Sequence, residues 1–128
     1  MTPLVLDRGA LSQLAQRTRA SAALVQALRD SGHWPPVVPT MVLVESLQQR
    51  TGADANVNRL LKACIVDDSV PEALARRAAE LRRTARRGSA VDALVAARAE
   101  PGGIVLTGDN ADLTALAAHA ATVTVEPI

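Results

Sequence analysis

The sequence predicts an α/β fold, a three-layer α/β/α sandwich on a mainly parallel central sheet. Short apolar runs recur along the chain, and segments with apolar residues at helical spacing separate them. Strands that alternate with helices form right-handed crossovers, which make the strands parallel and put helices on both faces. At 128 residues, 48% of them apolar and 21% charged, the chain suits a single globular domain over residues 1–128.

In the first half of the chain, prolines, glycines and Asp7 mark where the apolar segments end. Leu4–Leu6 is too short for a helix and is bounded by Pro3 and Asp7, as a buried strand would be. Gly52 interrupts a helical pattern, because glycine is unfavourable inside a helix. In order, we expect a strand over 4–6, helical residues 10–29 that 18–21 can divide into two helices, a strand over 37–38, and helices over 40–50 and 53–63.

The second half continues the alternation. Pro71 suits the start of a long helix, since the first turn of a helix does not need the missing N–H. Pro101, Gly102 and Gly103 stop a later helix just before the clearest apolar run. In order, we expect a strand over 65–66, a helix from 71 to about 88, a helix over 89–98, a strand over 104–106, a helix over 109–118 and a strand over 122–125.

The composition excludes several classes of site. The only cysteine, Cys64, permits neither an internal disulfide nor a Cys-rich zinc site. Trp34 is the only aromatic residue, so nucleic acid would have to bind without aromatic stacking platforms. The first residues do not resemble a signal peptide, and no apolar run is long enough to cross a bilayer. We therefore expect a cytoplasmic protein with no membrane partner.

Acidic residues follow the predicted strands. Asp7 comes directly after the first strand, and Asp109 follows the run Ile104–Leu106. Ligands of open parallel sheets bind beyond the carboxyl ends of the strands, so chain direction puts both acids at that edge. Glu45, on the helix after the second strand, and Asp92, in the first turn of a helix, can point to the same edge.

Acids gathered in one place favour a hard metal ion. Carboxylates that converge repel one another and raise each other's pKa unless a cation lies between them. Oxygen ligands suit Mg²⁺ or Mn²⁺, which bridge to phosphate oxygens and activate water. This chemistry needs no histidine or cysteine nucleophile, and His33 and His119 lie far apart from each other in the sequence.

Four stretches together resemble a PIN domain, and in particular the VapC-type toxins of bacterial toxin–antitoxin pairs. They are LVLDRGAL (4–11), VPTMVLVESL (38–47), GSAVDALVAARA (88–99) and VLTGDNADL (105–113). The resemblance implies a Mg²⁺- or Mn²⁺-dependent endoribonuclease that cleaves cellular RNA, forms a homodimer and is neutralised by a cognate antitoxin. By position, the acids Asp7, Glu45, Asp92 and Asp109 match the family's acidic quartet. Asp112 matches a further acid of the last motif, and Thr107 matches a frequent hydroxyl residue.

Each acid also has a structural explanation. Asp7 can be a turn residue after a strand, and Ser89 with Asp92 has the form of a helix capping box. Asp109 with Asp112 can cap the next helix in the same way. Glu45 is harder to explain, because it interrupts an apolar run where an unpaired acid would be expensive to bury.

The arginines leave two questions open. Arg8 follows Asp7 where many PIN domains have a small or hydroxyl residue, and it can either pair with Asp7 or hold a substrate phosphate. An arginine-rich helix suggests RNA binding, although the solvated face of an amphipathic helix explains it more simply. These arginines are Arg76, Arg77, Arg82, Arg83, Arg86 and Arg87, of which the last two precede the Asp92 segment.

Two other functions compete with the nuclease. A catalytically silent PIN-like module would bind RNA or protein without cleaving, and Arg8 is its one specific support. A phosphoacceptor receiver-type domain also places acids at strand ends. It fits poorly, because the chain has no acidic pair after the first strand, and its only lysine is Lys62.

Overall fold

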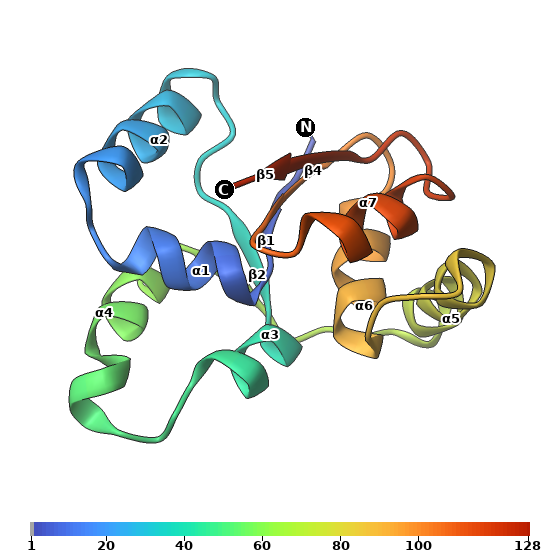
Figure 1. Ribbon diagram of the computed structural model, residues 1–128, viewed down its shortest axis with the longest axis horizontal. Helices are drawn as coiled ribbons and strands as arrows, with labels where there is room; N and C mark the ends of the chain where they lie inside the picture. Colours follow the sequence, from blue (N-terminus) through green and yellow to red (C-terminus); the bar gives the residue numbers. More distant parts are fainter. Residues whose placement is uncertain (1) are drawn as a thin grey trace.

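Residues 2–128 are described by a computed structural model. They form an α/β structure with five strands and seven helices (Figure 1). All strand pairs are parallel, and the sheet has the order β3-β2-β1-β4-β5. The strands are β1 (Leu4–Leu6), β2 (Val37–Pro39), β3 (Ile65–Asp67), β4 (Ile104–Thr107) and β5 (Thr124–Pro127). The predicted fold class is confirmed, and the sheet is wholly rather than mainly parallel.

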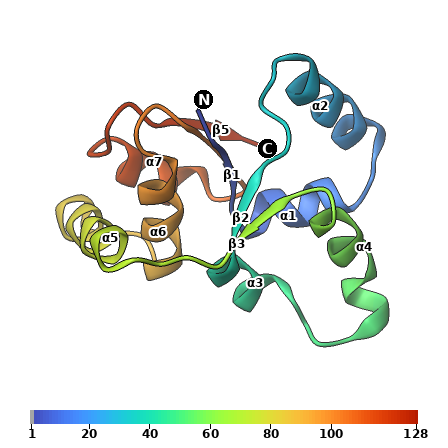
Figure 2. The same ribbon diagram turned by 180° about the vertical axis from the view of Figure 1, so that it is seen from behind.

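Helices cover both faces of this sheet. The helices are α1 (Arg8–Ala15), α2 (Arg19–Asp30), α3 (Thr40–Ser46), α4 (Thr51–Leu61), α5 (Glu72–Ala85), α6 (Ala90–Ala99) and α7 (Asn110–Ala117). One layer contains α1, α2 and α4, and the other contains α5, α6 and α7, as Figures 1 and 2 show from opposite sides. The short α3 follows β2 at the carboxyl edge and packs against α1.

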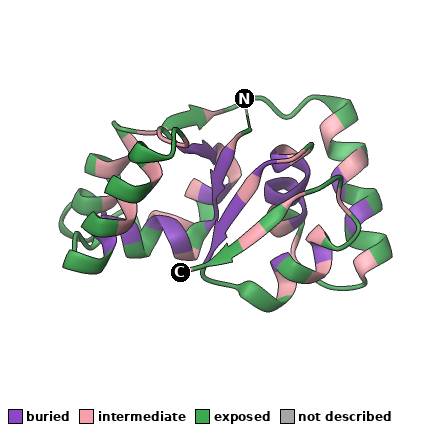
Figure 3. Ribbon diagram, turned by 90° about the horizontal axis from the view of Figure 1, so that it is seen from above, coloured by how far each residue is buried: buried purple, intermediate pink, exposed green. Residues whose placement is uncertain are grey.

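The core lies between the central strands and the helices that face them. Every residue of β1 is buried, and so are most residues of β4 and α6 (Figure 3). Helix α6 packs directly on β1 and β4, and four of its buried residues are alanines, Ala93, Ala96, Ala97 and Ala99. Small side chains let a helix approach a sheet closely, so α6 holds its first turn firmly at the carboxyl edge.

The edge strand β3 is different from the core strands. It lies at the edge of the sheet, beyond β2, and Ile65 and Val66 remain 51% and 42% exposed. Among residues 2–128, no helix is long and apolar enough to cross a membrane.

Several predicted boundaries were wrong, each for a local reason. Gly52 was expected to interrupt the helical pattern, but α4 begins at Thr51 and contains it, since glycine is unfavourable in the interior of a helix and Gly52 lies in the first turn. The helix expected over 40–50 ends at Ser46, because the Asp54 carboxylate accepts hydrogen bonds from the backbone N–H groups of residues 48–50 and fixes them as a loop. The last strand starts at Thr124 rather than Thr122, whose φ of 55° is not a strand conformation. Helix α5 ends at Ala85, short of Gly88, because Arg86 takes a left-handed conformation.

Candidate functional site at the carboxyl edge of the sheet

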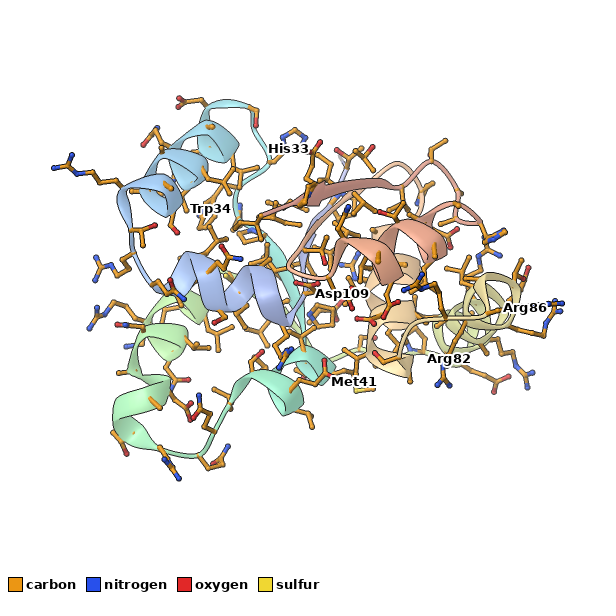
Figure 4. The ribbon with its side chains drawn as sticks, viewed as in Figure 1. His33, Trp34, Met41, Arg82, Arg86 and Asp109 are labelled. Carbon is orange, nitrogen blue, oxygen red and sulfur yellow. The ribbon has the colours of Figure 1, made fainter. Side chains whose placement is uncertain are left out.

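A cleft of about 300 Å³ opens at the carboxyl edge of the sheet. Its lining includes every acid that the sequence predicts for the site: Asp7, Glu45, Asp92, Asp109 and Asp112. These acids come from the end of β1, from α3, from the first turns of α6 and α7, and from the loop after β4. Figure 4 shows Asp109 where α1 and α7 come together, well away from His33 and Trp34 on the loop after α2.

Asp7 is buried and fully held by hydrogen bonds. It caps α1, and its Oδ1 accepts from the N–H of Ala10 at 2.9 Å and from the N–H of Gly108 at 3.1 Å. Its Oδ2 accepts from the hydroxyl of Thr107, which is completely buried. The Thr107 Oγ1 in turn accepts from the N–H of Asp109 at 2.7 Å. The turn-residue and site explanations of Asp7 are therefore compatible, since one carboxylate joins the loops that follow β1 and β4.

Three acids form a tight cluster beside Asp7. Asp92, Asp109 and Asp112 can each present one carboxylate oxygen so that the three oxygens lie within 4.8 Å of one another. Asp92 also completes the expected capping box: its Oδ2 accepts from the N–H of Ser89 at 3.1 Å, and its own N–H donates to Ser89 Oγ at 3.0 Å. Asp109 caps α7 by accepting from the N–H of Asp112 at 3.4 Å. Helix capping thus fixes Asp92 at the start of α6 and Asp109 at the start of α7, and Asp112 lies in the first turn of α7.

The electrostatics of the cleft favour a bound cation. Burial raises the pKa of Asp92 above its ordinary value, and the charges on Asp109 and Asp112 raise it further, although the hydrogen bonds from Ser89 oppose the rise. The first turns of α1, α6 and α7 all meet here, and their partial positive charges offset some of the repulsion. A divalent ion would offset much more of it.

Glu45 lines the cleft as an exposed residue. It is exposed rather than buried, as is its neighbour Val44, so the expectation of an acid trapped in an apolar run was wrong. Its place on the short α3, directly after β2, brings it to the cleft lining. Neither Glu45 nor Asp7 belongs to the three-acid cluster within residues 2–128.

Arginines stand at two sides of the cleft. Arg87 donates through Nε to Asp112 Oδ1 at 2.7 Å, so one member of the cluster already has an ion-pair partner. Arg8 lines the cleft and is exposed, and it is absent from the five ion pairs formed within residues 2–128. The predicted possibility of an Arg8–Asp7 pair is therefore not realised.

Three arginines of α5 have partners outside the cleft lining. Arg76 pairs with Glu72, and Arg77 pairs with Glu80 and Glu100. Arg82 donates to the carbonyl of Gly88 at 3.1 Å. Figure 4 shows Arg82 and Arg86 around α5, away from Asp109. These contacts favour the solvated-face explanation for this part of the arginine cluster.

A close contact between two glycines was not anticipated. A Cβ added to Gly9 would lie 2.6 Å from the Cα of Gly108, and one added to Gly108 would lie 2.8 Å from the Cα of Gly9. This contact brings the start of α1 against the loop after β4. A glycine shortly after each of two core strands was the signal available in the sequence.

A second hollow lies on the other side of α1. It is a larger, mainly apolar groove between α1, α2 and α4, lined by Leu14, Val25, Leu60, Trp34 and three arginines, Arg17, Arg29 and Arg59. The Arg29 guanidinium lies over the Trp34 ring, 5.4 Å from its centroid. No acid lines this groove, so it offers no carboxylate ligand for a metal ion.

The donor set of the cleft fits Mg²⁺ or Mn²⁺. Hard carboxylate oxygens are the ligands that both ions prefer, and the cleft has room for the waters that Mg²⁺ retains. Two oxygens on one Mg²⁺ lie up to about 4.2 Å apart, twice the usual metal–oxygen distance. The 4.8 Å limit on the three-acid cluster is close to that spacing.

Comparisons with known proteins leave the family open: no protein-family model matches the chain, and no curated protein matches it significantly.

Proposed function

We propose that the chain is a Mg²⁺- or Mn²⁺-dependent endoribonuclease of the PIN-domain type, acting as a VapC-like toxin. The observation that carries the proposal is the cleft itself. Five acids from separate parts of the chain, Asp7, Glu45, Asp92, Asp109 and Asp112, line one cavity at the carboxyl edge of a parallel sheet. Their order in the sequence is the order that the resemblance to PIN domains requires.

The five acids have three different roles in this proposal. Asp92, Asp109 and Asp112 would hold the metal, which supplies an activated water and offsets negative charge on the phosphate. Asp7 keeps the loops after β1 and β4 in register through its three hydrogen bonds, so its charge faces the cluster from a fixed place. Glu45 is exposed at the cleft and makes none of the side-chain hydrogen bonds found in residues 2–128, which suits a group that accepts a proton from water.

RNA cleavage by the purified protein tests the proposal. We expect Mg²⁺- or Mn²⁺-dependent cleavage of RNA that EDTA abolishes. Asp92→Asn and Asp109→Asn should lower the rate at least about 100-fold, because each removes a charged metal ligand. Asp68→Asn is the matched control, since Asp68 is exposed beyond β3 and does not line the cleft. Cleavage that survives both EDTA and the cleft substitutions would refute the proposal.

The partners belong to the same proposal. A cognate antitoxin as inhibitor, a homodimer and a cytoplasmic location follow from the resemblance, and the single cysteine suits a reducing compartment. A short upstream reading frame that encodes a DNA-binding protein would support the antitoxin, and light scattering on the purified protein would test the dimer.

A silent PIN-like binding module is the second candidate, and two contacts favour it. Asp7 is already satisfied by three internal donors, and Asp112 is already paired with Arg87. Thermal unfolding during metal titration separates the two functions. At a working site, Tm should rise with the Mn²⁺ concentration. The unfolding free energy should increase by about 2.7 kcal/mol when the Mn²⁺ concentration is 100 times the Kd, and Asp92→Asn should remove most of this gain. No shift and no cleavage would favour the silent module.

A further inference from the structure

Arg8 is the one cation in the cleft with no ion-pair partner within residues 2–128. The cleft lining contains five acids and this single arginine. Arg87, which pairs with Asp112 of the lining, is already engaged in that ion pair. Asp7, the immediate neighbour of Arg8, takes its hydrogen bonds from Thr107, Gly108 and Ala10 instead. The guanidinium is therefore exposed, charged and available to a molecule that enters the cleft.

The acids of the cleft attract Arg8, but its place at the start of a helix is unfavourable for a cation. Arg8 is the first residue of α1, where the partial positive charge of the helix end disfavours a cation. Acids are the residues that stabilise such a position, and α1 has none in its first turn. The helix end therefore does not account for this arginine, and no acid of the cleft forms an ion pair with it within residues 2–128, so its N–H donors remain open to an external anion.

We propose that Arg8 binds a phosphate group of the RNA strand in this cleft. The inference rests on the proposed function, because it names how that site receives its substrate. A polyanion that approaches five carboxylates is repelled, and a divalent ion offsets only part of that charge. The guanidinium has a planar fork of N–H donors that matches two oxygens of one phosphate, which an ammonium group does not. Arg8 thus gives the strand a fixed contact beside the acid cluster.

RNA affinity tests the proposal separately from cleavage. Binding of a fluorescent single-stranded RNA is measured by fluorescence anisotropy, with Ca²⁺ in place of Mg²⁺ or Mn²⁺ so that binding is measured apart from cleavage. A gel checks that the RNA stays intact. We expect Arg8→Gln to weaken binding about tenfold, the effect of losing a charge-assisted contact. The slope of log affinity against log salt should also fall by about one. Arg8→Lys should restore the salt slope but only part of the affinity, because it keeps the charge and loses the fork.

Arg19→Gln is the matched control. Arg19 is also an exposed first residue of a helix, α2, and it lines neither the acidic cleft nor the apolar groove. Its substitution should leave RNA affinity within about twofold of the wild type, the size of a surface change away from the binding site. Both glutamine variants should remain folded, with Tm close to that of the wild type in the same divalent ion, so that a loss of RNA affinity is not a loss of the fold.

The outcomes separate this inference from the nuclease proposal. RNA cleavage with an affinity that Arg8→Gln leaves unchanged would overturn the inference alone. The inference would also be overturned if Arg8→Gln tightened Mn²⁺ binding and left RNA affinity unchanged. Arg8 would then only balance the negative charge of the acids. Arg8-dependent binding without any cleavage would support the inference and overturn the nuclease.

Discussion

Thr107 is the residue on which the geometry of the candidate site depends most. Its hydroxyl is completely buried and has two partners at once: it donates to Asp7 and accepts from the N–H of Asp109. One side chain on β4 thereby links the acid after β1 with the acid that starts α7. The sequence resemblance singled out Thr107 as a hydroxyl residue of the last motif, and these two contacts are what its hydroxyl does in the structure.

Thr107→Val should impair both stability and activity. Valine has nearly the same shape, but it leaves a buried carboxylate oxygen without its donor and the N–H of Asp109 without its acceptor. We expect unfolding free energy in urea to fall by about 2 kcal/mol and RNA cleavage to fall with it. Thr107→Ser keeps the hydroxyl and should retain most of both.

Thr124→Val on the exposed start of β5 serves as the control and should change little. If Thr107→Val proved as stable and as active as the wild type, the hydroxyl would have no part in ordering the acids.

At the scale of elements, the close contact of Gly9 and Gly108 fixes how α1 meets the loop after β4. The two Cα atoms leave no room for a side chain on either residue. Both neighbours are backbone atoms, which cannot rotate away as the end of a side chain can. The contact thus sets the distance between the Asp7 and Asp109 loops.

Gly9→Ala should destabilise the protein by about 2 kcal/mol, the usual cost of forcing an extra methyl group into a packed site. Gly52→Ala is the matched control, because a Cβ there meets nothing within 4 Å and the residue lies in helix α4. It should instead stabilise the fold by about 0.5–1 kcal/mol. Urea unfolding of both variants gives the comparison, and equal effects would show that the glycine contact carries no strain.

The elements also show what sequence patterns can and cannot predict. Leu4–Leu6 and Ile104–Leu106 were recognisable because buried parallel strands are continuous apolar runs. The end of α3 was not, because it depends on Asp54 reaching back to the N–H groups of residues 48–50, a contact with no periodicity. The start of β5 was missed for a similar reason, since the backbone of Thr122 overrides the alternation of apolar residues.

For the whole molecule, the site was easier to predict in outline than in detail. Strand direction alone put Asp7 and Asp109 at one edge, and both line the cleft. Glu45 was expected for the wrong reason, because exposure cannot be inferred from one apolar run. The pairing of Arg87 with Asp112 joins residues that are far apart in the sequence, and only the packing of α7 beside α6 brings them together.

Long-range ion pairs also hold the outer parts of the molecule to α6. Arg98 on α6 donates to Asp67 at the end of β3 at 2.6 Å, and Arg77 on α5 pairs with Glu100 just after α6 at 2.8 Å. The hydrogen bond from Arg98 lowers the pKa of Asp67, helped by the N–H of Ser69, and the hydrogen bond from Arg77 lowers the pKa of Glu100. The folded state therefore binds protons on these carboxyl groups less readily than the unfolded chain does.

The unfolding free energy should consequently fall at low pH. Asp67→Asn should show how much of this loss comes from the ion pair between Asp67 and Arg98. A carboxyl whose pKa is lowered by folding stabilises the protein at every pH above its unfolded pKa, about 3.9 for aspartate, and loses this effect as pH falls through the folded value. We expect Asp67→Asn to lower unfolding free energy by about 1 kcal/mol at pH 7. The difference from the wild type should hold down to about pH 5, shrink below about pH 4 and disappear once the carboxyl is protonated in the folded state as well. Urea unfolding across this range, with Asp68→Asn as the exposed neighbouring control, measures it. A difference that persisted unchanged after the carboxyl is protonated would mean that Asp67 acts through packing, and that its charge does not hold β3 to α6.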